Sequence, residues 1–208
     1  MTLAEPMTLL TDYLLAGVTG WFGWLLFRAR EGQAARASWA LAFAGLALAA
    51  VLGGTHHGFA PHLSESALFL LWKATLLAVG MASFAMLAGS TIAATSGRLR
   101  GALLALATAK LAVYTGWMVF HDEFIYVITD TGLSMVAIAV LHGGSALRSG
   151  DRASLWVLGG VGVSVLAAGV QASGFTLHRH FNHNDLYHVV QIAAMALFYI
   201  GGRRLHDR

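Results

Sequence analysis

The stretch SALFLLWKATLLAVGMASFAMLAGSTIAA, residues 66–94, decides the fold class, because Lys73 is its only charged side chain. About 20 mostly apolar residues are enough to cross a bilayer as a helix. Six further runs of this kind occur, at 9–28, 37–58, 100–119, 124–147, 153–173 and 184–202. We therefore predict an all-α, polytopic membrane protein with seven transmembrane helices in one bundle.

The composition agrees with this class. Of the 208 residues, 57% are hydrophobic and only 11% are charged, which is too little charge to cover a soluble domain of this length. The connections between the runs are short, so we expect one domain over residues 1–208. The N-terminus carries Glu5 and Asp12 and lacks a basic region, so residues 9–28 are expected to stay as a first helix and not to be removed as a signal peptide. The chain has no cysteine, so any metal must be held by His, Asp, Glu or Asn.

The basic residues predict the orientation. Ten of the thirteen basic residues fall in the odd-numbered connections and the tail, namely Arg28, Arg30, Arg36, Arg98, Arg100, Arg148, Arg152, Arg203, Arg204 and Arg208. The opposite end of the bundle has only Arg179, and Lys73 and Lys110 lie within spans. We expect the N-terminus outside and the C-terminus in the cytoplasm, in a bacterial-type inner (plasma) membrane. The same rule accounts for the arginines, so nothing predicts a nucleic-acid partner.

Ionisable side chains gather at the predicted outer end. Carboxylates found there are Asp12, Asp122, Glu123 and Asp185. Eight of the ten histidines also lie there, namely His56, His57, His62, His121, His178, His180, His183 and His188. Imidazole and carboxylate at this density suit zinc or another first-row divalent metal. Ionisable groups at membrane depth are expensive and usually functional, so we predict a metal site facing the outside.

Helical geometry narrows the ligands on the last span. Asp185 and His188 are three residues apart and share a helix face. His183 is five residues before His188 and points away from it unless the helix begins after His183. We therefore predict His188 as one ligand, with Asp185 or His183 as another.

The second span supplies a further candidate ligand. His56 and His57 diverge by about 100° around a helix, so only one of them is expected to face the bundle interior. We take His57 as that residue. Gly53 and Gly54 lie one turn below it and would leave space for a substrate or water.

Two ionisable residues within spans predict an ion pair. Lys73 and Asp130 each lie about two turns below the outer surface, on the third and fifth spans. Lys110 lies deeper, near the middle of the fourth span. The last span has no lysine, so a retinal Schiff base of the microbial-rhodopsin kind is not expected.

Seven spans, the histidine of GGTHHGF (residues 53–59) and the motif NDLYH (residues 184–188) together resemble the CREST superfamily. That superfamily contains alkaline ceramidases, adiponectin-receptor-like proteins and relatives of the Per1 type. The resemblance implies a zinc-dependent membrane amidase, with one histidine on helix 2 and an H-x-x-x-H motif on helix 7. The predicted N-out orientation matches the ceramidase branch.

The match to the family motifs is partial. His57 corresponds to the helix 2 histidine, but the family's serine four residues earlier is Gly53 here. His188 corresponds to the second histidine of helix 7, while Asn184 stands at the position of the first. The family's acidic residue has no clear equivalent, although Glu65 is near the expected place.

Three hypotheses about function follow. The first is a zinc-dependent hydrolase of a lipid-like amide or ester at the outer leaflet, with Asp12, Asp122 or Glu123 as general base. The second is a non-enzymatic metal or haem protein, such as a sensor or an electron-transfer subunit, in which His57 and His188 ligate a haem. The third is a receptor or scaffold whose polar cluster is structural. A homo-oligomer is compatible with all three.

Overall fold

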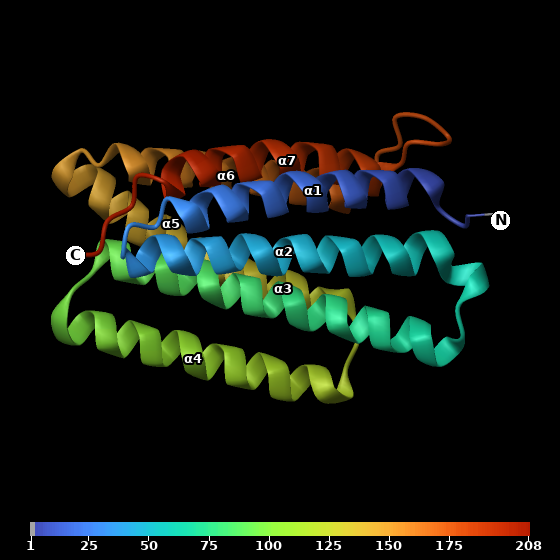
Figure 1. Ribbon diagram of the computed structural model, residues 1–208, viewed down its shortest axis with the longest axis horizontal. Helices are drawn as coiled ribbons and strands as arrows, with labels where there is room; N and C mark the ends of the chain where they lie inside the picture. Colours follow the sequence, from blue (N-terminus) through green and yellow to red (C-terminus); the bar gives the residue numbers. More distant parts are fainter. Residues whose placement is uncertain (1–2) are drawn as a thin grey trace.

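The computed structural model describes residues 3–208, which form an all-helical bundle (Figure 1). Over that range the chain has seven α-helices and one 3-10 turn: α1 Pro6–Arg28, α2 Ala34–Phe59, η1 Ala60–His62, α3 Glu65–Ala94, α4 Gly97–Phe120, α5 Phe124–Ser149, α6 Arg152–Ser173 and α7 His183–Gly202. Each predicted apolar run lies inside one of these helices. The all-α fold class is therefore confirmed.

Six of the helices in residues 3–208, α1 to α6, are long and apolar enough to cross a membrane. This indicates an integral membrane protein. Helix α7 has 20 residues but is not among these six. Its first two turns contain His183, Asn184, Asp185 and His188, and these polar side chains make it less apolar than the others.

The helices alternate in direction and lie side by side (Figure 1). Helix α1 packs against both α2 and α7, α3 packs against α2 and α5, and α6 packs against α7. Helix α4 lies at the edge of the bundle, where it packs mainly against α3. Helix α1 thus contacts both α2 and α7, so the first and last helices are neighbours, while α2 and α7 meet directly where Trp39 packs on Phe198.

The C-terminal segment 203–208 closes one end of the bundle. The connections α1–α2, α3–α4 and α5–α6 lie at this end, which carries the ten basic residues and is called the basic end below (Figure 1). The Asp207 carboxylate accepts hydrogen bonds from the backbone N–H groups of Ala34 and Ala35, both at 2.9 Å. It therefore caps α2, whose first N–H groups have no partner within the helix. The Arg208 backbone N–H donates to the Ile92 carbonyl of α3 at 3.3 Å.

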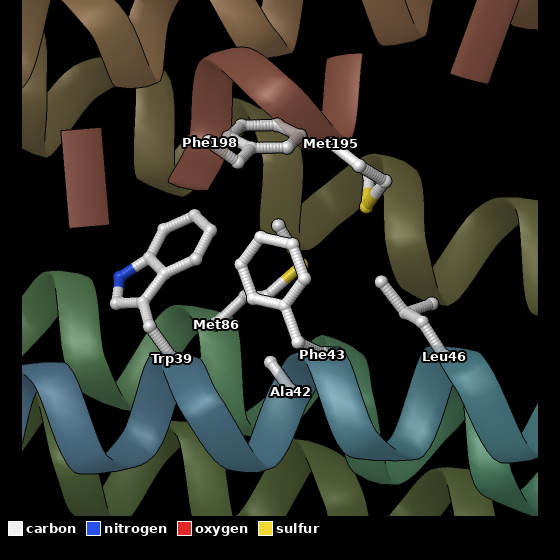
Figure 2. A pocket seen from close by; sticks show the side chains of 7 residues that line it. All are labelled: Trp39, Ala42, Phe43, Leu46, Met86, Met195 and Phe198. Carbon is white, nitrogen blue, oxygen red and sulfur yellow. The ribbon is translucent and has the colours of Figure 1, made fainter. Parts of the chain in front are cut away.

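The larger of two apolar core clusters among the described residues lies in the basic half of the bundle. Figure 2 shows Trp39 and Phe43 of α2 facing Met195 and Phe198 of α7, with Met86 of α3 between them. The space that these side chains enclose has no room for a water molecule. This tight packing holds α7 in the bundle and so fixes the position of its polar first turns at the opposite end.

Candidate functional site

Helix α7 begins with a capping box that buries a carboxylate. The Asn182 side-chain oxygen accepts from the backbone N–H groups of Asn184 (2.8 Å) and Asp185 (3.3 Å), and Asp185 Oδ2 accepts from the Asn182 N–H at 2.8 Å. These reciprocal bonds fix the first turn of the helix. Asp185 is only 1% exposed, and its Oδ1 has no hydrogen-bond partner among the described residues.

His188, one turn further along α7, meets helix α1. Its Nε2 lies 3.2 Å from Asp12 Oδ1, and its Nδ1 lies 3.0 Å from Thr11 Oγ1. Thr11 Oγ1 donates to the Met7 carbonyl at 3.0 Å, so the hydroxyl accepts from Nδ1–H and the Nε2 lone pair points at Asp12. A proton then lies between Nε2 and Oδ1, carried by the ring or by the carboxyl group. In the other tautomer Nε2–H donates to Asp12, which again places a proton between these two atoms.

The Asp12–His188 pair is shielded and close to further charge. Asp12 is 6% exposed. Asp185 and Glu5 lie within electrostatic range of Asp12, and His57 lies within electrostatic range of His188. Buried carboxylates require a compensating positive charge or a proton. The cluster therefore has to bind protons or another cation.

Close packing of α1 on α2 positions Asp12. A Cβ on Gly54 would lie 2.8 Å from Asp12 Cβ and 3.1 Å from a ring carbon of Tyr13. A Cβ on Gly53 would meet only Thr75 of α3, at 3.6 Å. The predicted space for a substrate below His57 is therefore wrong, because α1 fills it at Gly54 and Gly53 faces another helix.

The two histidines of α2 face different neighbours. His57 Nδ1 lies 3.5 Å from Glu5 Oε1, at the start of α1. His56 Nδ1–H donates to the Leu68 carbonyl of α3 at 3.2 Å. His57 thus lies on the side of the Asp12–His188 pair, and Glu5 joins the cluster as a carboxylate that motif reasoning had not selected.

The other predicted site residues lie apart from the pair. Asp122 and Glu123 form the turn before α5, where the Asp122 carbonyl accepts from Trp72 Nε1 at 2.8 Å. The Glu123 carboxylate accepts from the Asp122 N–H at 3.1 Å, and bonds to its own and the Asp122 N–H hold the pKa of this exposed group below its usual value. His183 is the first residue of α7, and its five-residue distance from His188 turns the two side chains about 140° apart around the helix, so His183 points away from His188. In residues 3–208, no three His, Asp or Glu side chains are close enough together to hold a metal ion.

A cavity of about 190 Å³ opens beside the cluster, at the end of the bundle opposite the basic end. It is lined by Ala4, Glu5, Pro6, Met7, Thr8, Arg179, His180, Asn182 and Asp185. A volume of this size holds several water molecules or a small polar group. Asp185 therefore connects the cavity to the buried pair, while Arg179 supplies a positive charge at its wall.

The predicted ion pair between Lys73 and Asp130 is wrong. Lys73 Nζ donates to the carbonyls of Met118 and His121 at the end of α4, at 2.8 and 2.5 Å. Asp130 pairs instead with Lys110, whose Nζ lies 2.5 Å from Oδ1. The unpaired carbonyls of the α4 C-terminus attract Lys73, and its amine is satisfied there.

Comparison with protein families identifies the family of this chain. Residues 7–207 match the model of a family of unknown function, DUF6962, and the chain belongs to that family. No curated protein matches it. No solved structure matches it either.

Proposed function

We propose that the protein is a membrane hydrolase that acts on a lipid-like amide or ester near the outer leaflet. In this proposal α7 is the seventh span, the N-terminus is outside and the basic end is in the cytoplasm. One observation carries the proposal: a buried, proton-holding Asp12–His188 pair lies near Asp185, which lines a cavity at the end opposite the basic end and has a carboxylate oxygen without a partner among the described residues. Six apolar helices and the arginines of the basic end support the orientation.

The residues suit hydrolysis because it requires a base that takes a proton from water and an acid that protonates the leaving group. The Asp12–His188 pair can take up one proton and release it again, with the proton shared by His188 Nε2 and Asp12 Oδ1. Thr11 holds the imidazole ring of His188 in place. The free oxygen of Asp185 can accept a hydrogen bond from a water molecule in the cavity. Arg179 can bind the developing negative charge of the substrate carbonyl.

The donor types also fit zinc. His188 Nε2 and the carboxylates of Asp12 and Asp185 are nitrogen and oxygen donors of the kind that Zn²⁺ accepts, and Thr11 would orient the ring as an outer hydrogen-bond partner. As placed in residues 3–208 these three side chains lie too far apart to hold one ion together, so zinc binding would require them to move closer. When bound, zinc would supply Lewis-acid activation of water and of the scissile carbonyl.

Haem ligation by His57 and His188 does not fit. At this level Asp12 of α1 meets both Gly54 of α2 and His188 of α7, so α1 occupies the space between the two helices here. A porphyrin between the two histidines would need the volume that α1 occupies. The second candidate function is therefore a receptor or scaffold, which is favoured by the hydrogen bonds on both nitrogens of His188.

The test uses protein purified in detergent without a polyhistidine tag. Elemental analysis and turnover of fluorogenic lipid amides and esters are compared for the wild type, His188→Ala, Asp12→Asn and the control His121→Ala. His121 lies at the same end of the bundle but stacks on Trp117 at 4.0 Å, away from the pair. Turnover that the site variants lose and the control keeps would support the hydrolase. Absence of turnover by wild-type protein, or full activity of His188→Ala, would refute it and favour the scaffold.

Zinc content distinguishes a zinc-dependent hydrolase from one that works without a metal. One equivalent of zinc in the wild type and the control, absent from His188→Ala, would identify a metal site. Activity that survives removal of metal by a chelator would instead identify the Asp12–His188 pair as sufficient.

A further inference from the structure

A second polar cluster lies within the bundle, away from the α1–α7 site. Lys110 Nζ of α4 lies 2.5 Å from Asp130 Oδ1 of α5 and 3.4 Å from Ser83 Oγ of α3. Ser83 Oγ in turn lies 2.8 Å from Ser134 Oγ of α5. Asp130 is 6% exposed, and its Oδ2 has no hydrogen-bond partner within residues 3–208. A charged pair within membrane-spanning helices is expensive and usually marks a path for ions or protons.

One buried face of α5 runs from this pair toward the basic end and is polar except at Ile138. The buried face of α5 presents Asp130, Ser134, Ile138 and His142 at intervals of four residues. His142 Nδ1 lies 2.8 Å from Ser154 Oγ, and Ser154 Oγ donates to Asp151 Oδ2 at 2.6 Å. The Ser154 hydroxyl therefore accepts from Nδ1–H, which leaves a lone pair on Nε2.

The Nε2 atom of His142 is buried without a partner among the described residues. Asp151, at the other end of this hydrogen-bond chain, lies in the α5–α6 connection and is partly exposed. The chain Asp151–Ser154–His142 therefore runs from the surface of the basic end to a proton acceptor inside the bundle.

Helix α3 adds a further unsatisfied group at the level of His142. Helices α3 and α5 run in the same direction, and the contact of Ser83 with Ser134 sets their register. Ser90 is seven residues after Ser83, so it shares the same face of α3 and lies level with the turn that contains His142. Ser90 is fully buried, and its Oγ also has no partner in the part of the chain described.

Within residues 3–208, four unpartnered polar atoms thus lie on α3 and α5: Asp130 Oδ2, Ser90 Oγ, Thr91 Oγ1 and His142 Nε2. A buried polar group without a partner costs about 1–3 kcal/mol, and such groups in native proteins usually bind ordered water. The 12 residues from Asp130 to His142 span about 18 Å of helix, with the Ser134 hydroxyl and the buried apolar side chain of Ile138 between them. A proton path along this face therefore requires water molecules to enter beside Ile138.

We propose that Lys110 and Asp130 form a proton-binding site that is reached from the basic end through His142. For inward transfer, Asp151 passes a proton to the Ser154 oxygen, Ser154 passes its own hydroxyl proton to His142 Nδ1, and the ring releases Nε2–H to water between α3 and α5, which leaves the Nδ1–H form described above. Asp130 accepts the proton at Oδ2 and loses its negative charge. The amine of Lys110, 2.5 Å from Asp130 Oδ1, provides the positive charge that opposes this uptake. The other charged or titratable groups in electrostatic range are Tyr114 of α4 for Asp130, and Asp151 and Arg208 for His142.

The experiment measures protonation of Asp130 by its reaction with dicyclohexylcarbodiimide, an apolar reagent that modifies protonated carboxyl groups. Labelling is read by mass spectrometry in proteoliposomes whose inner and outer pH are set separately. The native chain has no cysteine, so Arg204→Cys provides a single thiol that reports which way the basic end faces. We expect Asp130 to be labelled, and the labelling to rise as the pH falls on the side of the basic end.

Two variants and a control sharpen this test. Lys110→Met removes the opposing charge, so labelling of Asp130 should extend to higher pH. His142→Phe should slow the response to a pH change at the basic end without changing the final extent of labelling. Thr108→Ala, on the exposed face of α4, should behave as the wild type. Asp130 that stays unlabelled in both the wild type and Lys110→Met, or labelling that follows the pH of the opposite end, would overturn the proposal.

Discussion

Replacing Gly54 by alanine is the sharpest test of how α1 positions Asp12. The new Cβ would lie 2.8 Å from Asp12 Cβ, whereas ordinary contacts begin at 3.4 Å, so α1 must move away by several tenths of an ångström. Gly53→Ala is the matched control, because its Cβ would meet Thr75 at an ordinary 3.6 Å. Both changes gain about 1 kcal/mol of helix propensity, which cancels when they are compared. The difference is the overpacking alone, about 1–3 kcal/mol.

The assay is thermal unfolding of both variants in detergent, together with turnover of the substrate that the wild type accepts. For a chain of this size, 1 kcal/mol corresponds to about 2–4 °C in Tm. Gly54→Ala should unfold at a lower temperature than Gly53→Ala and should lose activity, since the 3.2 Å contact of Asp12 with His188 is disturbed. Equal Tm values for the two variants would show that α1 does not contact α2 as described.

Three further predictions concern other parts of the bundle. Asp130→Leu leaves Lys110, whose side chain is 20% exposed, without its carboxylate partner and should lower the free energy of unfolding by up to about 3–5 kcal/mol, and denaturant titration should show recovery in the double variant Lys110→Met/Asp130→Leu. Asp207→Ala removes the cap of α2 and should cost about 0.5–2 kcal/mol in the same titration, whereas no change would exclude a capping role. Glu123 has a lowered pKa because backbone N–H groups bond its carboxylate, so its contribution to stability is present above the pKa of the unfolded chain and disappears as the pH falls through the folded value. Unfolding followed across acidic pH should therefore depend less on pH in Glu123→Gln than in the wild type.

The sequence predicts the helices well, because the length and apolarity of each run depend only on local composition. It also predicts that Asp12 and His188 lie at the same end of the bundle. Their contact could not be predicted, since it requires α1 to pack against α7, and the chain order does not determine which helices are neighbours. Lys110 was missed as the partner of Asp130 for a related reason: depth along a helix was estimated, but not which helix faces it.

In the cluster around Asp12, too, the sequence predicts what is determined within one helix but not the contacts between helices. His188 and Asp185 were selected correctly as neighbours on one helix face, because a spacing of three residues determines this locally. The roles of Thr11 and Glu5 depend on contacts with α7 and α2, and neither residue belongs to a motif. Gly54 was read as empty space because a glycine in a sequence does not show which side chain covers it.

The cap that Asp207 places on α2 has a consequence for synthesis of the chain. Asp207 and Ala34 are separated by 173 positions, so a ribosome that adds about 5–20 residues per second makes the capping residue about 10–35 seconds after the helix start. During that interval the first two helices have been released into the membrane without the bonds that join α2 to the tail. The first turn of α2 therefore lacks its cap until Asp207 has been translated, which happens after all seven helices have been made. An insertion factor or a lipid head group that occupies the N–H groups of Ala34 and Ala35 in the meantime would be displaced only when Asp207 arrives.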